Sequence, residues 1–236
     1  MEVFVDNKNI IKKESELIGS LFSFHGARVI ELGCGSGAIA TEIQGNFKTN
    51  QYVGCEVDSI QHRKNVLASD RTGIEFVYAG AEKIPCPDSY FDYVLMFKSL
   101  HHVPVKSMPT ALSEIGRVLK VGGVAWISEP VYKGDFNELV KIFNDEGFVR
   151  ENAFKAVCDS VEDGIFKLRE QIFFYLRREF SSFEDFESKV VKVTYSENSM
   201  SEDSYLNLRK MYGGFSDDSG RVEFLAPMRI DVLEKV

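Results

Sequence analysis

Three glycines directly after a short apolar segment have a spacing that could do chemistry. The segment Val29-Ile30-Glu31-Leu32 leads into Gly33, Gly35 and Gly37, and a predicted helix over 36–44 follows. Glycines at alternate positions let the backbone turn tightly and approach a bound molecule where a side chain would collide. The N-terminus of the following helix would point at that molecule. The spacing therefore predicts a ligand-binding turn between a strand and a helix.

The carboxylate of Glu31 indicates the charge of that ligand. It would repel a pyrophosphate and attract a ligand that carries an ammonium and a sulfonium, which favours S-adenosylmethionine over NAD. Gly33, Gly35 and Ala38 nevertheless also satisfy the dinucleotide pattern G-x-G-x-x-G/A. Glu56, which ends the next apolar segment, could accept hydrogen bonds from the ribose of either cofactor. NAD remains the alternative ligand, and a glycine turn without a ligand is the third interpretation.

Composition limits the classes of function. The chain has 236 residues and a net charge of −8, which suits one α/β domain and disfavours a long nucleic-acid footprint. Its four cysteines show no C-x-x-C spacing, so no metal site is expected. We see neither a secretory leader nor an apolar run long enough for a membrane span. These features predict a cytoplasmic protein with no membrane partner.

Strand and helix patterns alternate over the first half of the chain. Short apolar segments predict strands, separated by segments of helical periodicity, and an amphipathic helix is expected at 8–23. The expected strands are 28–32, 52–56, 74–78, 92–97 and 123–128, and the expected helices are 36–44, 59–68 and 107–119. This alternation predicts an α/β fold, a doubly wound, mostly parallel Rossmann-like sheet. Ligands of such sheets bind beyond the carboxyl ends of the strands.

The pattern changes after residue 131. We expect a single domain over 1–236, with a cofactor-binding core at 1–130 and 217–236. Residues 131–216 are predicted to form a mainly helical insert after strand five that covers the substrate. Its expected helices are 136–143, 150–161, 165–175, 183–194, with a Ser182–Asp185 cap, and 202–211, and a closing strand is expected at 222–233. The sixth strand is hard to place, and 173–180 is the candidate.

Residues 27–130 resemble the class I S-adenosylmethionine-dependent methyltransferases, the small-molecule branch in particular. Residues 31–37 and 54–58 resemble that family's first two motifs, and 81–92 resemble the loop and strand that hold the adenine. Leu100-His101-His102-Val103 and residues 114–123 follow in the order seen in many relatives. Several ordered motifs are far more specific than one glycine loop.

The resemblance implies a set of cofactor-binding residues. Glu31 would meet the methionine ammonium, Glu56 would bind both ribose hydroxyls, and Val57 would pack on the adenine. One departure is Gly80, because the family commonly has an acid there that bonds the adenine amine, so Glu82 would take over or affinity would be lower. The complete set is Glu31, Gly33, Cys34, Gly35, Gly37, Glu56, Val57, Ala81 and Glu82.

Two adjacent histidines follow the fourth predicted strand, where the transferred methyl group would lie. His102 could accept a proton from a hydroxyl substrate, because imidazole titrates near neutrality. A purely structural role is the alternative, and we favour it for His101. Lys98 either reaches solvent or contacts an acidic substrate group. Glu129 either binds substrate or merely precedes the proline that ends a strand.

These residues together predict methyl transfer from S-adenosylmethionine to a small-molecule acceptor, at oxygen because of the nearby histidines. Three alternatives stay open: a non-catalytic cofactor-binding partner subunit, an NAD-dependent oxidoreductase and an RNA methyltransferase. No nucleic-acid partner is expected, and the sequence carries no signal for the oligomeric state.

Overall fold

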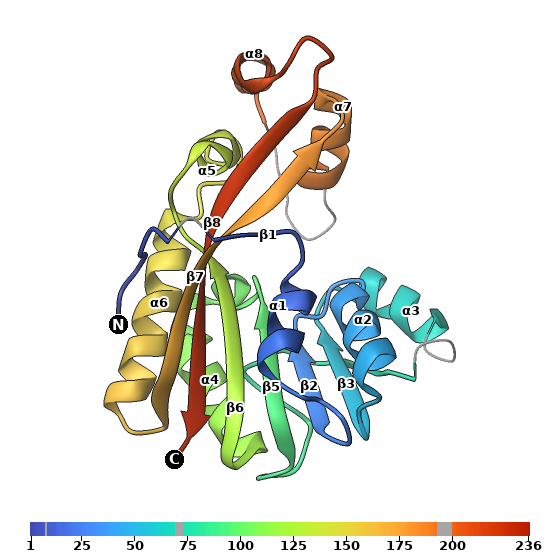
Figure 1. Ribbon diagram of the computed structural model, residues 1–236, viewed down its shortest axis with the longest axis vertical. Helices are drawn as coiled ribbons and strands as arrows, with labels where there is room; N and C mark the ends of the chain where they lie inside the picture. Colours follow the sequence, from blue (N-terminus) through green and yellow to red (C-terminus); the bar gives the residue numbers. More distant parts are fainter. Residues whose placement is uncertain (8, 69–72, 193–199) are drawn as a thin grey trace.

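One mixed sheet of eight strands organises the computed structural model, which describes residues 1–7, 9–68, 73–192 and 200–236. β8 runs antiparallel to both of its neighbours, and every other pair of described strands is parallel. The expected α/β, doubly wound, mostly parallel sheet is therefore confirmed (Figure 1). In spatial order the strands are β1 (Ile10–Ile11), β7 (Phe166–Phe180), β8 (Val222–Lys235), β6 (Leu119–Pro130), β5 (Phe91–Phe97), β2 (Arg28–Leu32), β3 (Gln51–Glu56) and β4 (Glu75–Tyr78).

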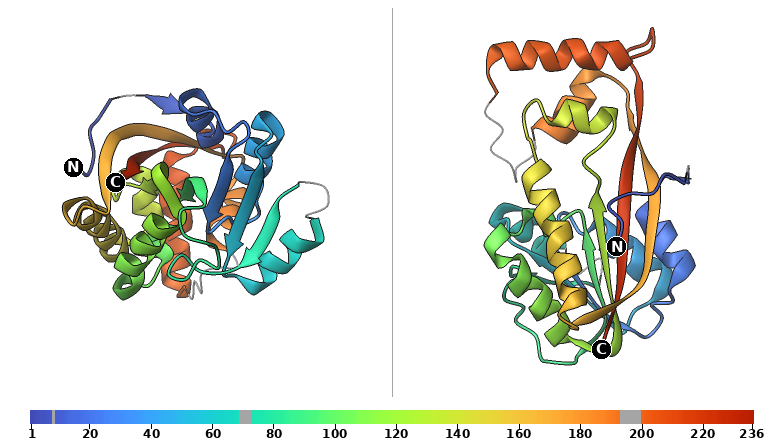
Figure 2. Two further views of the ribbon diagram at one scale, coloured as in Figure 1. Left: turned by 90° about the horizontal axis from the view of Figure 1, so that it is seen from below. Right: turned by 90° about the vertical axis from the view of Figure 1, so that its left-hand side faces the viewer.

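Alternating side chains give the central strands two apolar faces. Ile30 and Val94 pack into one core with α4 and α6, whereas Val29 and Leu95 pack into a second core with α1 and α2. Helices therefore cover both faces (Figure 2), as the side-chain period of two in a strand requires. The helices are α1 (Glu14–Leu21), α2 (Ala38–Phe47), α3 (Ser59–Ala68), α4 (Met108–Val118) and α6 (Gly147–Glu162).

The far halves of β7 and β8 extend past the other strands and carry a third core (Figure 1). Four helical elements surround this end: α5 (Asp135–Val140), α7 (Phe183–Phe186), η4 (Glu187–Val191) and α8 (Glu202–Phe215). Together with β7 and β8 they bury aromatic and aliphatic side chains: Leu139, Phe180, Phe183, Phe186, Val191, Leu208, Tyr212, Val222 and Phe224. This third core is separate from the two cores on the sheet faces. It stabilises the far halves of β7 and β8, which we call the extension, beyond the ends of the other strands.

The expected helix over 165–175 is wrong, because these residues belong to the long strand β7. Lys167, Arg169 and Glu170 interrupt its apolar residues and imitate a helical pattern. β8 supplies a hydrogen-bonding partner along nearly the whole of β7, and this pairing decides the conformation. The candidate sixth strand over 173–180 lies inside β7 and is confirmed in position but too short.

The remaining elements match the expectations with altered ends. The first helix spans only Glu14–Leu21, and the closing strand is β8, antiparallel to its neighbours. Ser182 caps α7 by accepting a hydrogen bond from the Asp185 amide at 3.2 Å, as predicted. Residue 8 and residues 193–194 of two expected helices lie outside the described residues.

Among the described residues, no helix combines the length and the apolar character needed to cross a lipid bilayer.

Candidate active site

The glycine turn connects β2 to α2 and is held open by backbone hydrogen bonds. The amides of Gly33 and Cys34 both donate to the Cys55 carbonyl at 2.9 Å. Gly33, Gly35 and Gly37 all have positive φ angles, between 53° and 71°. A Cβ on Gly33 would lie 2.6 Å from Ser99 Cβ, whereas a Cβ on Gly35 would meet nothing within 4 Å. Gly33 is therefore needed for packing, and Gly35 leaves free space beside the backbone.

The Glu56 carboxylate ends β3 and closes the turn from the other side. Its Oε1 accepts from the amides of Val57 and Asp58 at 2.8 Å, and its Oε2 accepts from the Gly35 amide at 2.7 Å. These three donors fix the orientation of a carboxylate that is 7% exposed. Each carboxylate oxygen can still accept another hydrogen bond, so the group remains available to hydroxyl donors.

Glu31 lies deeper than the cavity wall. Its carboxylate is 2% exposed and accepts a hydrogen bond from the Tyr52 hydroxyl at 2.7 Å. Burial raises the pKa of Glu31 to about 8, although Tyr52 and the charge of Lys98 act in the opposite direction. At neutral pH the side chain is therefore mainly protonated, and a cation nearby would favour its ionised form.

Lys98 ties the N-terminal helix to this site. It has a φ of 56°, and its Nζ donates to Glu14 Oε2 at 2.7 Å, while the Ser128 hydroxyl donates to Glu14 Oε1 at 3.2 Å. Glu14 is buried in α1. Lys98 thus has a buried counter-ion, while about a third of its side chain stays exposed. It neutralises a buried carboxylate while its side chain lines the cavity.

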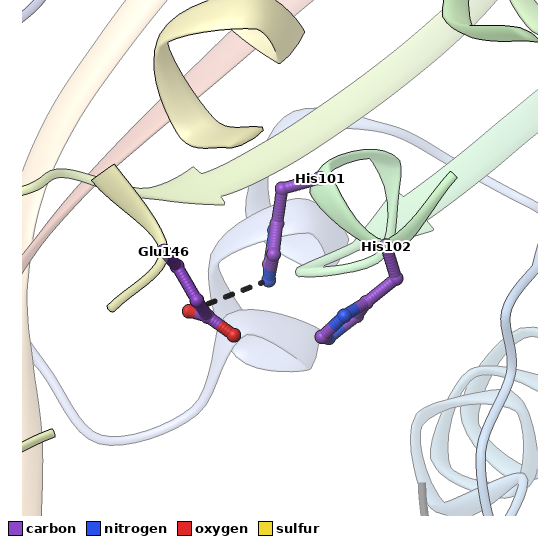
Figure 3. A group of neighbouring side chains, drawn as sticks. All are labelled: His101, His102 and Glu146. Carbon is purple, nitrogen blue, oxygen red and sulfur yellow. Dashed lines mark ion pairs between the residues drawn. The ribbon is translucent and has the colours of Figure 1, made fainter. Parts of the chain in front are cut away.

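His101 and His102 occupy η2 (Leu100–His102), and buried Glu129 from β6 orients the first of them. Glu129 Oε2 lies 2.5 Å from His101 Nδ1, and its Oε1 accepts from the Leu100 amide at 2.9 Å. Because the carboxylate can only accept, His101 Nδ1 must donate. His101 Nε2 then points toward Glu146, 3.8 Å away (Figure 3).

The two histidines have opposite charge preferences. Burial lowers the pKa of His101, but the charge and hydrogen bond of Glu129 outweigh it and the pKa is raised. Burial and the charge of His101 lower the pKa of His102 below its ordinary 6.5. His101 therefore favours the imidazolium form, and His102 is neutral at pH 7 and able to accept a proton.

His101, His102 and Glu146 bring three ligand atoms within 4.8 Å of one another, which raises the question of a metal ion (Figure 3). Arg150 donates to Glu146 Oε2 at 2.5 Å, and Asn144 donates to its Oε1 at 2.9 Å. The guanidinium already neutralises this carboxylate, and a metal would have to compete with a fixed positive charge. The donor set therefore favours a hydrogen-bonded network, and the expectation of no metal stays a prediction.

One cavity of about 1200 Å³ joins these groups. The predicted site residues that line it are Gly33, Gly35, Glu56, Val57, Ala81, Glu82, His101 and His102. Glu31, Cys34 and Gly37 do not line it. Cys34 is buried behind the turn, and a Cβ on Gly37 would meet the ring of Phe76 at 2.9 Å.

Sequence reasoning missed the partners of the cavity side chains. It did not connect Glu129 with His101, nor Glu14 with Lys98, and it overlooked Glu146 and Arg150 entirely. The members of each pair lie 28 and 84 residues apart in the chain. No local spacing pattern signals them. The position of Glu129 at the end of a predicted strand was the one sequence feature that could have indicated its place in the site.

Comparison with known proteins identifies the domain. Residues 29–123 match the model of a methyltransferase domain. The fatty-acid O-methyltransferase of Mycolicibacterium smegmatis is 36% identical over 103 residues, 42% of this chain and 35% of that enzyme. A sterol 24-C-methyltransferase of Gibberella zeae is 29% identical over 137 residues, 55% of this chain and 35% of that enzyme. The chain thus spans about a third of the length of these curated relatives.

The fold agrees over nearly the whole chain. The crystal structure of a putative methyltransferase from Bacillus halodurans superposes with a TM-score of 0.66, covering 94% of this chain and 98% of the other at 19% identity. Residues 29–123 belong to the class I S-adenosylmethionine-dependent methyltransferases. The resemblance stated from the sequence is confirmed, and with it S-adenosylmethionine as the cofactor of this methyltransferase domain.

The cavity of the methyltransferase domain fits this cofactor. Val57 is apolar, 59% exposed and part of the cavity wall, as expected for a side chain that packs on adenine. Glu56 can accept from ribose hydroxyls, and the backbone at Gly35 has open space beside it. Which atoms each predicted residue contacts stays a prediction.

The Glu82 carboxylate lies beside Gly80, the position at which the family resemblance implies an acid. A Cβ on Gly80 would lie 2.6 Å from Glu82 Oε1, so the Glu82 carboxylate occupies the place where a side chain at 80 would begin. Glu82 also lines the cavity. This placement supports Glu82 as the acceptor for the adenine amine.

We expect S-adenosylhomocysteine to displace a proton from Glu31. With a pKa of about 8, Glu31 is mainly protonated at pH 7, and the ligand ammonium favours ionisation. Calorimetric titration in buffers of different ionisation enthalpy should show proton release on binding by the wild type, and Glu31→Gln should release none. Equal release by the wild type and Glu31→Gln would contradict this role.

We expect Glu82→Ala to remove the preference for adenine over hypoxanthine. The wild type should bind S-adenosylhomocysteine about tenfold more tightly than S-inosylhomocysteine, which lacks the amine. The double variant Gly80→Asp/Glu82→Ala should restore that preference, because it places an acid where relatives carry one. A preference that survives in Glu82→Ala would refute the assignment.

Proposed function

We propose that this chain transfers a methyl group from S-adenosylmethionine to an oxygen atom of a small-molecule acceptor, with His102 as the proton acceptor. The observation that carries the proposal is the shared cavity, which the glycine turn, Glu56 and His102 all line. The cofactor, when bound, supplies an electrophilic methyl group on a sulfonium. The protein must then hold the acceptor oxygen in line and exclude water.

The histidine pair supports a division of roles. Glu129 holds His101 in one orientation, and burial together with the His101 charge lowers the pKa of His102. His102 is exposed to the cavity, and its ring centroid lies 4.1 Å from that of His101. An acceptor hydroxyl beside His102 could transfer its proton to the neutral ring as the new carbon–oxygen bond forms. His101 acts as a positioning residue in this scheme.

A small acceptor suits the site better than a nucleic acid. The wall formed by β7, β8, α5 and η4 lines one side of the cavity, so residues 131–216 would act as the predicted substrate-covering insert. The net charge of −8 disfavours a long phosphate backbone. The names of the relatives, a fatty-acid O-methyltransferase and a sterol 24-C-methyltransferase, also support small acceptors.

Carbon is the second candidate acceptor atom, because the sterol relative is named for methylation at carbon. A base beside the methyl group would serve either chemistry. Product analysis separates them, since hot hydriodic acid releases iodomethane from an O-methyl group, whether ether or ester, and not from a C-methyl group.

Titration with S-adenosylhomocysteine tests the cofactor half of the proposal. We expect micromolar binding by the wild type and at least tenfold weaker binding by Glu56→Ala, because the ribose hydroxyls lose their acceptor. Glu75→Ala, at an exposed position of β4, serves as a matched carboxylate control. Wild-type protein that binds NADH but not S-adenosylhomocysteine would overturn the proposal in favour of an oxidoreductase.

The pH dependence of methyl transfer tests the role of His102. Because its pKa lies below 6.5, the neutral base is present at pH 7 and becomes protonated as the pH falls. We expect the rate to fall below about pH 6.5 in the wild type, and His102→Gln to lose both this acid limb and about 10²-fold or more in rate. An unchanged acid limb in His102→Gln would show that another group titrates.

A further inference from the structure

The cavity has room for a second molecule beside the cofactor. Its volume is about 1200 Å³, whereas pockets for single drug-sized ligands run from about 300 to 1000 Å³. Part of its wall comes from the far halves of β7 and β8, from α5 and from η4, all outside the strands that hold the cofactor (Figure 1). We call this part of the cavity the distal end.

The charged side chains that line the cavity differ between the cofactor side and the distal end. The acidic residues that line the cavity are Glu56, Asp58, Glu82 and Glu146. The first three lie around the ends of β3 and β4 on the cofactor side, and Glu146 is paired with Arg150. Among the described cavity-lining residues after position 150, the charged side chains are all cationic. The distal end therefore favours an anion, although the whole chain carries a net charge of −8.

Four cationic side chains line the distal end, and we call them the distal cations: Lys133, Arg178, Lys189 and Lys192. The Arg178 guanidinium lies 5.2 Å from the centroid of the Phe136 ring, which itself lines the cavity. Lys189 and Lys192 pair with Asp185 and Glu187, whose side chains do not line the cavity. Each ammonium has three N–H donors, so one ion pair leaves donors for a ligand.

Apolar side chains line the same cavity, and we call them the apolar strip. They come from α5 and the turn after it, and from the facing strands β7 and β8: Phe136, Val140, Phe143, Leu176, Pro227 and Met228. A hydrocarbon body would be stabilised along this strip, because its apolar surface would leave water.

Building on the proposed methyl transfer, we infer that the acceptor is an amphipathic anion. Its apolar body would lie along this strip, its carboxylate or phosphate would bind the distal cations, and its methyl-accepting oxygen would lie at His102. The acceptor is thus recognised by a negative charge remote from the reacting atom. Arg178 packs against Phe136 and carries five N–H donors, so it can add hydrogen bonds to an anion beside its existing interactions.

Three ten-carbon probes test this inference: decyl phosphate, decanoate and decan-1-ol. We expect each anion to bind the wild type at least tenfold more tightly than the alcohol, and the preference to weaken with added salt. The order of the two anions shows which headgroup suits the site. Arg178→Met should reduce the preference to about threefold or less, and Arg178→Lys should keep part of it.

Arg177 is the matched control. It is the next residue of β7, so its side chain points to the opposite face of the strand, where it pairs with Glu223 at 3.1 Å. Arg177→Met should keep the full preference for anions. If Arg178→Met fails to fold, Lys189→Met removes another distal cation from an exposed position and should lower the preference at least threefold.

Equal affinity for the three probes, or a preference that Arg178→Met leaves intact, would overturn the inference. The second result would mean that the anion lies at the His102 end. Each titration is run with and without S-adenosylhomocysteine. Failure to bind S-adenosylhomocysteine would therefore count against the proposed function, while the alkyl series still decides the anion site.

Discussion

Buried carboxylates around one edge of the sheet are the constraint on which the site depends. Glu14, Glu31, Glu56 and Glu129 are all nearly inaccessible to solvent, and each buried negative charge costs several kcal/mol unless it is compensated. Each has a different partner: the ammonium of Lys98, the hydroxyl of Tyr52, three backbone amides and the imidazole of His101. Glu14 and Glu129 are balanced by basic side chains and Glu31 is mainly protonated, so Glu56 supplies the negative charge beside the predicted cofactor site.

These compensations divide the carboxylates by function. Glu14 and Glu129 are neutralised by basic side chains, so they orient Lys98 and His101 and are not free to bind cations. Glu56 is held by dipoles alone, and Glu31 keeps its charge low by retaining a proton. Of these four, the two that the family resemblance assigns to the cofactor, Glu31 and Glu56, are the two held by a hydroxyl and by backbone amides, whereas Glu14 and Glu129 are held by basic side chains.

The extension of β7 and β8 builds the other side of the cavity by a different principle. Its largely aromatic core holds the far halves of the two strands together with the four helical elements beyond the other strands of the sheet. Because a strand alternates its faces, neighbouring residues of β7 can serve separate purposes. Arg178 faces the cavity, while Arg177 pairs with Glu223 on the outer surface. A cationic, apolar-lined end can thus form within an acidic protein.

The sequence by itself determined the cofactor half of this protein. The motifs that bind S-adenosylmethionine are local, since a strand, a turn of three glycines and a terminal acid lie within a few consecutive residues. The alternation of strand and helix patterns predicted the doubly wound sheet, and the family resemblance implied most of the cavity residues on that side. The tertiary structure alone decided the acceptor half. The conformation of β7 depends on pairing with β8, and the state of His101 depends on Glu129, 28 residues away. Contacts between segments that are distant in the sequence produce no periodic pattern of residues. They depend on which strands lie side by side and which strand ends meet at one edge of the sheet.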